Sequence, residues 1–167
     1  MNEDGYRRLS APFRAEPLAR ALILTNKALT ALGYIAYPAL LVTLALAGRF
    51  DLLARCILVP GVAFAAVTLL RRAIDARRPY EALDIDPVIK KETSGRSFPS
   101  RHAFSLFMIA VSWMVAQPAV GCALIACATA LAFIRVIGGV HYPRDVAAGA
   151  LLAVLAGLVG YVLIPLQ

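Results

Sequence analysis

Long uninterrupted apolar stretches dominate the pattern of residues along this chain. Four segments contain no Asp, Glu, Lys or Arg at all: residues 28–48, 56–70, 103–134 and 146–167. A helix needs about 20 apolar residues to cross roughly 30 Å of hydrocarbon. Measured against that length, the four segments predict helices that cross a lipid bilayer.

The apolar segments divide into five predicted spans. Ala28–Gly48 forms the first and Leu52–Leu70 the second. The segment 103–134 is too long for one span, and the Pro and small residues of Ala116–Gly121 predict a hairpin that separates spans three and four. Val146–Pro165 forms the fifth.

The first 27 residues have a different pattern, in which charged and apolar residues alternate. As a helix, this segment carries an apolar face with basic residues outside it: Leu18, Ala21 and Leu22 on the face, Arg20 and Lys27 beyond it. It lacks the unbroken apolar core of a cleaved signal peptide. We therefore expect two parts, with residues 1–27 as an interfacial N-terminal segment and residues 28–167 as a membrane-embedded domain.

Composition supports an all-α fold, a polytopic membrane helical bundle of about five transmembrane helices plus an N-terminal interfacial amphipathic helix. The chain is 60% hydrophobic and 16% charged, which is too apolar for an ordinary soluble domain. Its net charge of +7 could suggest nucleic acid. The basic residues, however, fall at the predicted span ends, where anionic lipid headgroups are the expected partners. We expect the bilayer as a partner and no nucleic acid.

The polar residues that interrupt the apolar pattern are predicted to meet at one membrane face. With the hairpin between spans three and four, the end of span two, the start of span three, the end of span four and the start of span five share that face. Arginine, histidine and aspartate side chains gathered at helix ends suit a phosphate oxyanion better than they suit packing. The convergent residues are Arg71, Arg78, Ser100, His102, Arg135, His141 and Asp145.

Each of these residue types has a task in phosphoryl transfer. Ser100 can cap span three and leave backbone N–H groups free for an anion, and arginine forks would stabilise the charge of the transition state. Asp145 follows His141 by four residues, so its carboxylate can hold one imidazole nitrogen and leave the other as a nucleophile. His102 could then act as the general acid and base. Two His and one Asp with these duties leave no complete ligand set for a catalytic metal.

Three sequence blocks carry a resemblance to a known family. Arg71-x6-Arg78-Pro79, Pro99-Ser100-Arg101-His102 and Arg135-x5-His141-x3-Asp145 resemble the type 2 phosphatidic acid phosphatase superfamily. The pattern of that family is Lys-x6-Arg-Pro, Pro-Ser-Gly-His and Ser-Arg-x5-His-x3-Asp, in the same order and with the same spacing. Each block alone is weakly informative, whereas the three together are highly specific.

The resemblance implies a lipid phosphatase that needs neither a metal nor another cofactor. In it, His141 would become phosphorylated, Asp145 would orient it, and His102 would be the acid and base. The residues that would hold the phosphate are Arg71, Arg78, Ser100 and Arg135, with backbone N–H groups near Arg101.

The chain departs from the family pattern at three positions. Arg71 replaces Lys and keeps the charge, and Ile134 replaces Ser and removes one hydrogen-bond donor. Arg101 replaces Gly and adds a cation that can meet a second phosphate or a headgroup. The remaining cations of the loop before span three are expected to be solvated, with headgroup binding as the alternative: Lys90, Lys91 and Arg96.

The expected substrate is a lipid phosphate. The compact chain and the phrase GVHYPRDV look similar to bacterial undecaprenyl pyrophosphate phosphatases, which favours a polyprenyl diphosphate, with phosphatidylglycerophosphate or phosphatidic acid as alternatives. Competing classes are a catalytically silent lipid-binding or transport protein and a vanadate-dependent haloperoxidase, whose members are soluble.

The predicted location is the bacterial plasma membrane, and two indications disagree about which side the site faces. The resemblance implies a site on the extracytoplasmic face. Counting basic residues beside the spans places the same face in the cytoplasm. We follow the resemblance, because charges required for catalysis are poor indicators of topology.

Overall fold

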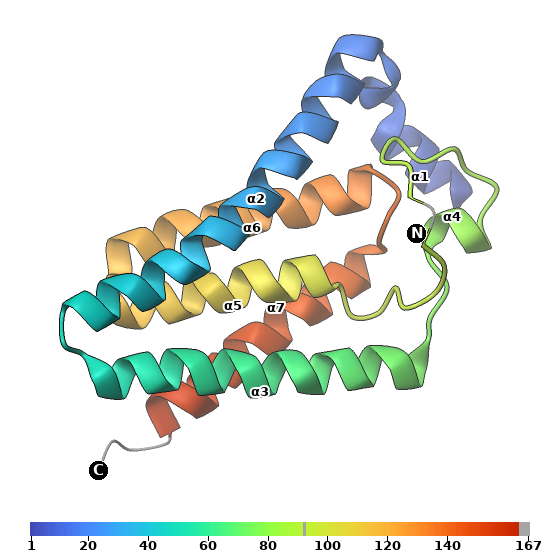
Figure 1. Ribbon diagram of the computed structural model, residues 1–167. Coiled ribbons are helices and arrows are strands. Elements are labelled where there is room, and N and C mark those ends of the chain that lie inside the picture. Colours follow the sequence, from blue (N-terminus) through green and yellow to red (C-terminus); the bar gives the residue numbers. More distant parts are fainter. Residues whose placement is uncertain (92, 164–167) are drawn as a thin grey trace.

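The computed structural model describes residues 1–91 and 93–163, and every regular element among them is a helix (Figure 1). The all-α prediction is therefore confirmed. In chain order the elements are α1 (Glu3–Ser10), the 3-10 turn η1 (Ala11–Arg14), α2 (Glu16–Leu46), α3 (Phe50–Ile74), α4 (Pro79–Ala82), α5 (Arg101–Ala116), α6 (Pro118–Ile137), α7 (Pro143–Gly157) and the π-helical turn η2 (Leu158–Leu163).

Five apolar helices follow one another in the order of the five predicted spans. Four helical segments of the described chain, those containing α2, α3, α6 and α7, are long and apolar enough to cross a membrane. The fifth, α5, has 16 residues, fewer than the roughly 20 that a perpendicular span needs. Five is therefore an approximate count of crossings. The predicted end of the last span, Pro165, lies outside the described residues.

The turns between these helices lie where the sequence predicts them. Helix α5 ends at Ala116 and α6 begins at Pro118, so the hairpin falls inside the segment expected to turn. Pro143 likewise occupies the first turn of α7. Proline suits that position because its fixed φ is helical and its missing N–H would have no helical partner there.

The N-terminal region differs from the expectation in one respect. No break separates residues 1–27 from the first span, because α2 runs without interruption from Glu16 to Leu46. Of the expected apolar face, Leu22 is buried against other parts of the protein, while Leu18 and Ala21 are exposed. The first turns of α2 extend beyond the bundle (Figure 1), so a division at residue 27 remains a prediction about membrane placement.

Helix α5 is the central element of the bundle, since it packs against α2, α3, α6 and α7. Its inward side chains, including Phe104, Met108 and Trp113, are buried in the main core. The approach of α7 to α5 is close: a Cβ added to Gly149 would lie 2.6 Å from the carbonyl oxygen of Ser100. Only glycine permits this contact, which brings the start of α7 beside the start of α5.

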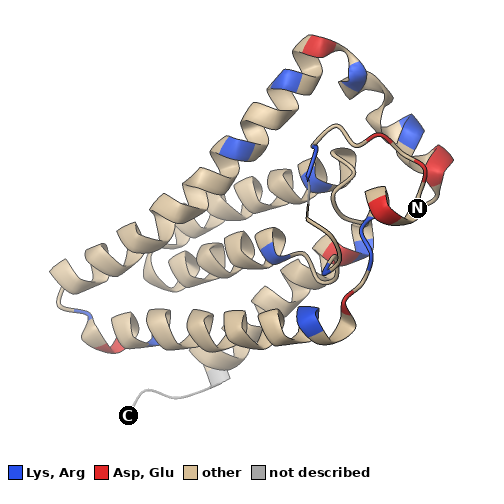
Figure 2. Cartoon of the chain, turned by 45° about the vertical axis from the view of Figure 1, so that its right-hand side comes forward, with Lys and Arg blue, Asp and Glu red and all other residues tan. Residues whose placement is uncertain are grey.

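The outer surface of the bundle is apolar along the middle of the helices. Large apolar side chains such as Tyr34, Ile35 and Val62 are 78%, 68% and 69% exposed. Charged residues gather toward the two ends (Figure 2). An exposed apolar belt with charged ends suits a bilayer, where the helices satisfy their own backbone hydrogen bonds.

The polar loop between α3 and α5 lies over one end of the bundle and is held there by the N-terminal segment. Tyr6 is fully buried, and its hydroxyl lies 3.4 Å from the carbonyl oxygen of Asp86 and 3.3 Å from the amide nitrogen of Val88. Arg7 and Arg14 donate to loop carbonyls as well. These contacts hold residues 84–88 of the loop against the N-terminal segment.

Candidate active site

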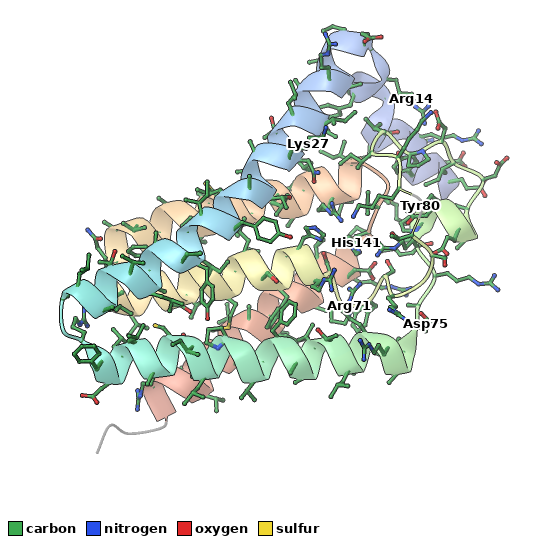
Figure 3. The ribbon with its side chains drawn as sticks, in the orientation of Figure 1. Arg14, Lys27, Arg71, Asp75, Tyr80 and His141 are labelled. Atoms are coloured by element: carbon green, nitrogen blue, oxygen red, sulfur yellow. The ribbon has the colours of Figure 1, made fainter. Side chains whose placement is uncertain are left out.

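The predicted site residues meet at one end of the bundle, beneath this loop (Figure 3). A cavity of about 790 Å³ lies there, and its lining includes Arg71, Arg78, Arg101, His102 and His141. Each comes from a helix end or a connecting segment. Arg71 and Arg135 lie in the last turns of α3 and α6. Ser100 caps α5, which begins with Arg101 and His102, and Arg78 precedes α4. His141 lies before α7, and Asp145 lies in the first turn of α7.

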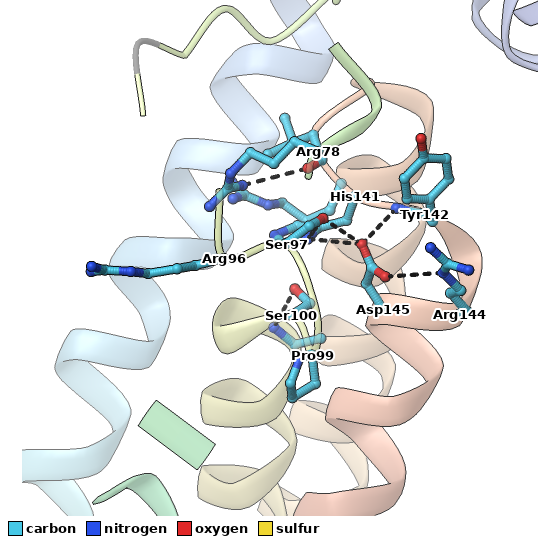
Figure 4. Close-up of polar contacts among 12 residues, drawn as sticks. Arg78, Arg96, Ser97, Pro99, Ser100, His141, Tyr142, Arg144 and Asp145 are labelled. Carbon is cyan, nitrogen blue, oxygen red and sulfur yellow. Dashed lines mark hydrogen bonds and ion pairs between the residues drawn. The ribbon is translucent and has the colours of Figure 1, made fainter. Parts of the chain in front are cut away.

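His141 and Asp145 form a buried pair, each only 1% exposed. The Nδ1 atom of His141 lies 3.5 Å from Oδ2 of Asp145 (Figure 4). The same oxygen accepts from the Ser97 hydroxyl at 2.5 Å and from the backbone N–H of Tyr142 at 3.0 Å. Helix α7 begins at Pro143, and its first turn brings the Asp145 carboxylate beside the His141 imidazole. The pair thus has the arrangement that its spacing predicts.

The carboxylate determines which nitrogen of His141 is basic. An ionised Asp145 can only accept hydrogen bonds, so Nδ1 of His141 carries the proton and Nε2 carries the lone pair. Burial, together with the positive charges of Arg135 and Arg78, lowers the pKa of His141 to about 4, although Asp145 acts in the opposite direction. The imidazole is therefore neutral near pH 7, as a nucleophile must be.

His102 is oriented by an arginine in place of a carboxylate. Nη2 of Arg135 lies 3.4 Å from Nδ1 of His102. Because a guanidinium can only donate, Nδ1 must accept this hydrogen bond, and the neutral ring then carries its proton on Nε2. The two neutral histidines are consequently opposite tautomers. Nε2 carries the lone pair in His141 and the proton in His102.

Arg135 has an unpartnered donor inside the protein. Its side chain is 1% exposed, and Nη1 donates to the side-chain oxygen of Asn26 at 3.4 Å. Its Nε finds no hydrogen-bond partner in the described structure. Buried donors without an acceptor are uncommon.

Arg71 and Arg78 bind loop carbonyls as well as lining the cavity. Arg71 donates to the carbonyl oxygens of Arg96, Ser97 and Pro99. Arg78 donates through Nε to Gly95 at 3.0 Å and through Nη1 to Val140 at 3.4 Å. Each guanidinium keeps further N–H groups, so phosphate binding by both residues remains a prediction.

The start of α5 supplies backbone donors. Ser100 is fully buried, its Oγ accepts from the N–H of Ala103 at 3.5 Å, and its own N–H donates to the carbonyl of Asp145 at 2.8 Å. Within the described chain, the N–H groups of Arg101 and His102 have no acceptor. A helix start with open N–H groups is an anion-binding position.

Sequence reasoning assigned no role to two residues that the structure places here. Ser97 completes the environment of Asp145, and Asn26 binds Arg135 from α2. Lys91 was expected to be solvated, with headgroup binding as the alternative, and it is half-buried and lines the cavity. Arg96 also lines the cavity and is exposed. Lys90 is exposed. Burial, followed by the charges of Arg135 and Arg78, lowers the pKa of Lys91 to about 8.

Comparison with curated proteins gives partial matches to bacterial proteins. The chain is 38% identical over 82 residues to the bacitracin transport permease protein BcrC of Bacillus licheniformis, and 38% identical over 85 residues to a lipid A 1-phosphatase of Rhizobium etli. Each match covers 48% of this chain but only 40% and 37% of the relative. The chain thus spans about two fifths of their length.

Solved structures match almost the whole chain. The crystal structure of Aquifex aeolicus LpxE superposes with a TM-score of 0.74 at 25% identity, covering 95% of this chain and 93% of that one. A transmembrane PAP2 type phosphatidylglycerolphosphate phosphatase from Bacillus subtilis superposes with a TM-score of 0.52 at 22% identity, covering 93% and 90%. The second likeness concerns the fold alone.

The family model of the PAP2 superfamily matches residues 52–167, which is more than half of the chain and includes all three sequence blocks. The resemblance carried by those blocks is therefore confirmed, and with it the assignment to a membrane phosphatase superfamily. This protein belongs to the PAP2 superfamily.

Proposed function

We propose that this protein is an integral-membrane lipid phosphatase that works through a phosphohistidine on His141. The observation that carries the proposal is the buried His141–Asp145 pair, whose 3.5 Å contact leaves Nε2 free beside a cavity lined with cations. An uncharged nucleophile close to several arginines suits attack on a phosphate, because the arginines offset the charge that the phosphate brings.

The reaction takes two steps. Nε2 of His141 attacks phosphorus and the bond to the leaving oxygen breaks, while His102, protonated on both ring nitrogens in the complex with the anionic phosphate, donates one proton to that oxygen and becomes neutral. A water molecule then gives a proton to His102 and attacks the phosphohistidine, so that phosphate leaves and both histidines return to their first state. Arg135, whose Nη2 lies 3.4 Å from Nδ1 of His102, adds a positive charge that offsets the charge of the phosphate in both steps.

The proposed reaction needs no metal. Among the described residues, no group of three or more His, Cys, Asp or Glu side chains is placed to hold a metal ion. Because His141, Asp145 and His102 have separate duties as nucleophile, orienting group and acid, we expect phosphate release to continue in excess EDTA. We also expect inhibition by vanadate, which mimics the five-coordinate transition state. Phosphate release from the purified protein checks both points. Complete loss in EDTA that zinc or magnesium restores would refute a metal-independent reaction.

The proposed substrate is a polyprenyl diphosphate, with phosphatidylglycerophosphate or phosphatidic acid as the alternative. An apolar groove of about 620 Å³ between α2, α3 and α5 leads to Arg101 and His102, which suits a lipid tail whose phosphate lies in the polar cavity. Phosphate release measured against a panel of lipid phosphates tests the proposal. Tight binding without release from any of them would instead favour a catalytically silent lipid-binding protein.

We further propose that the site faces the extracytoplasmic side of a bacterial plasma membrane. Asp86 lies in the loop over the site, and Asp51 lies in the first turn of α3 at the opposite end of the bundle. In a cysteine-free background, Asp86→Cys should react with an impermeant maleimide in intact cells, whereas Asp51→Cys should react only after lysis. The reverse pattern would place the site in the cytoplasm.

A further inference from the structure

The polar cavity and the apolar groove meet at two consecutive residues. Arg101 and His102 line both of them, whereas His141 lines only the polar cavity among these two spaces. A lipid whose terminal phosphate lies at His141 and whose tail lies in the groove must therefore pass Arg101. Whatever chemical group joins the phosphate to the tail is placed beside this side chain.

Arg101 has no counter-charge in the described structure. It forms no ion pair and its guanidinium donates no hydrogen bond within the described residues. Lys91, Arg71 and Arg78 line the same cavity, and its two carboxylates, Asp75 and Glu81, accept hydrogen bonds from backbone N–H groups. Cations therefore outnumber the acidic residues around Arg101. Like charges gathered in this way repel one another, and the repulsion is relieved when an anion of matching charge binds between them.

A monoester and a diphosphate would use this cluster differently. A phosphoryl group bonded to Nε2 of His141 lies in the polar cavity, whereas Arg101 lines both that cavity and the groove. In a phosphate monoester, the group beside Arg101 would be the first carbons of the tail, and a cation there would lack a partner. In a diphosphate, a second phosphate occupies that position.

We infer that Arg101 binds the phosphate that stays with the lipid when a lipid diphosphate is cleaved, so that this protein prefers diphosphates to monophosphates of the same tail. The inference rests on the proposed phosphatase function and names the substrate class of that site. It also explains why an arginine occupies a position where the family pattern has glycine.

Nε2 of His141 forms a bond to the terminal phosphorus, and the bond from that phosphorus to the bridging oxygen breaks. The electron pair leaves on the bridging oxygen, which becomes part of a lipid monophosphate whose negative charge Arg101 stabilises. Because a phosphate is a far weaker base than an alkoxide, this leaving group depends less on the proton of His102.

The test compares farnesyl diphosphate with farnesyl monophosphate, which share one tail. In Arg101→Gln, we expect kcat/KM for the diphosphate to fall about 10- to 100-fold, as for the loss of a charged hydrogen-bonding contact. The value for the monophosphate should change by less than about threefold, because only the contact to the second phosphate is lost. Lys90→Gln, which removes an exposed cation of the same loop, should alter neither value.

Two further variants keep the inference open to test if the glutamine variant does not fold. Arg101→Gly restores the residue of the family pattern and should lose the diphosphate preference, while Arg101→Lys should keep part of it. An equal fall for both substrates, or an unchanged diphosphate rate, would overturn the inference and leave the phosphatase intact. No release from either substrate by the unmodified protein would refute the proposed function itself.

Discussion

Replacing His141 with alanine is expected to abolish phosphate release and leave the helical bundle folded. The substitution removes the nucleophile, and loss of a nucleophile costs at least about 10⁴-fold in kcat in comparable enzymes. The fold should survive, because His141 lies in the connection between α6 and α7 and because Asp145 keeps its contacts to Ser97 and Tyr142. Phosphate release and circular dichroism of the purified variant provide the measurements.

A neighbouring substitution supplies the control. Arg144 follows His141 by three residues, its side chain is 73% exposed, and its Nε lies 3.7 Å from Asp145. An exposed pair at that distance contributes little, so Arg144→Gln should retain activity within about threefold of the unmodified protein. Turnover in His141→Ala similar to that of Arg144→Gln would exclude His141 as the nucleophile.

Substituting asparagine for Asp145 should have the second largest effect, mainly on kcat. An amide that turns its NH₂ group toward Nδ1 of His141 would stabilise the tautomer with the proton on Nε2, which has no lone pair for phosphorus. Loss of a carboxylate from a comparable histidine pair costs about 10⁴-fold in kcat. KM should change little, because the structure places the carboxylate behind the imidazole and away from the cavity lining.

Ser97→Ala is the matched milder variant for this prediction. It removes the hydroxyl that lies 2.5 Å from the carboxylate but leaves both the negative charge and the N–H of Tyr142. We expect kcat to fall about tenfold without a change in KM, as for the loss of one hydrogen bond to a charged group. An unchanged kcat in Asp145→Asn, measured beside Ser97→Ala, would mean that the carboxylate only caps α7.

Much of the fold could be predicted because membrane spans depend on local composition. The uncharged stretches and the Pro118 turn mark the helices and the hairpin without reference to any distant contact. The start of α2 could not be predicted in the same way. Arg20 and Lys27 suggest a separate segment, yet a helix that extends past the bundle accommodates both charges, and α2 continues through them.

In the candidate site, contacts between residues close in the sequence could be predicted, whereas contacts between distant residues could not. His141 and Asp145 lie one helical turn apart, so their spacing alone predicts their contact. Ser97 reaches Asp145 across 48 residues and Asn26 reaches Arg135 across 109, and no spacing indicates either pair. Arg71 shows the same limit, because its hydrogen bonds to loop carbonyls depend on the path of the folded loop.

Detection of the phosphohistidine is the most direct test of the mechanism. Purified protein is mixed with a lipid diphosphate labelled in its terminal phosphate and quenched within one turnover under alkaline conditions, where phosphohistidine survives and phosphate esters of Ser are distinguishable by peptide mapping. The account predicts labelled phosphate on the peptide that contains His141, and its absence from His141→Ala. Label on another residue, or turnover with no protein-bound phosphate at any time point, would contradict it.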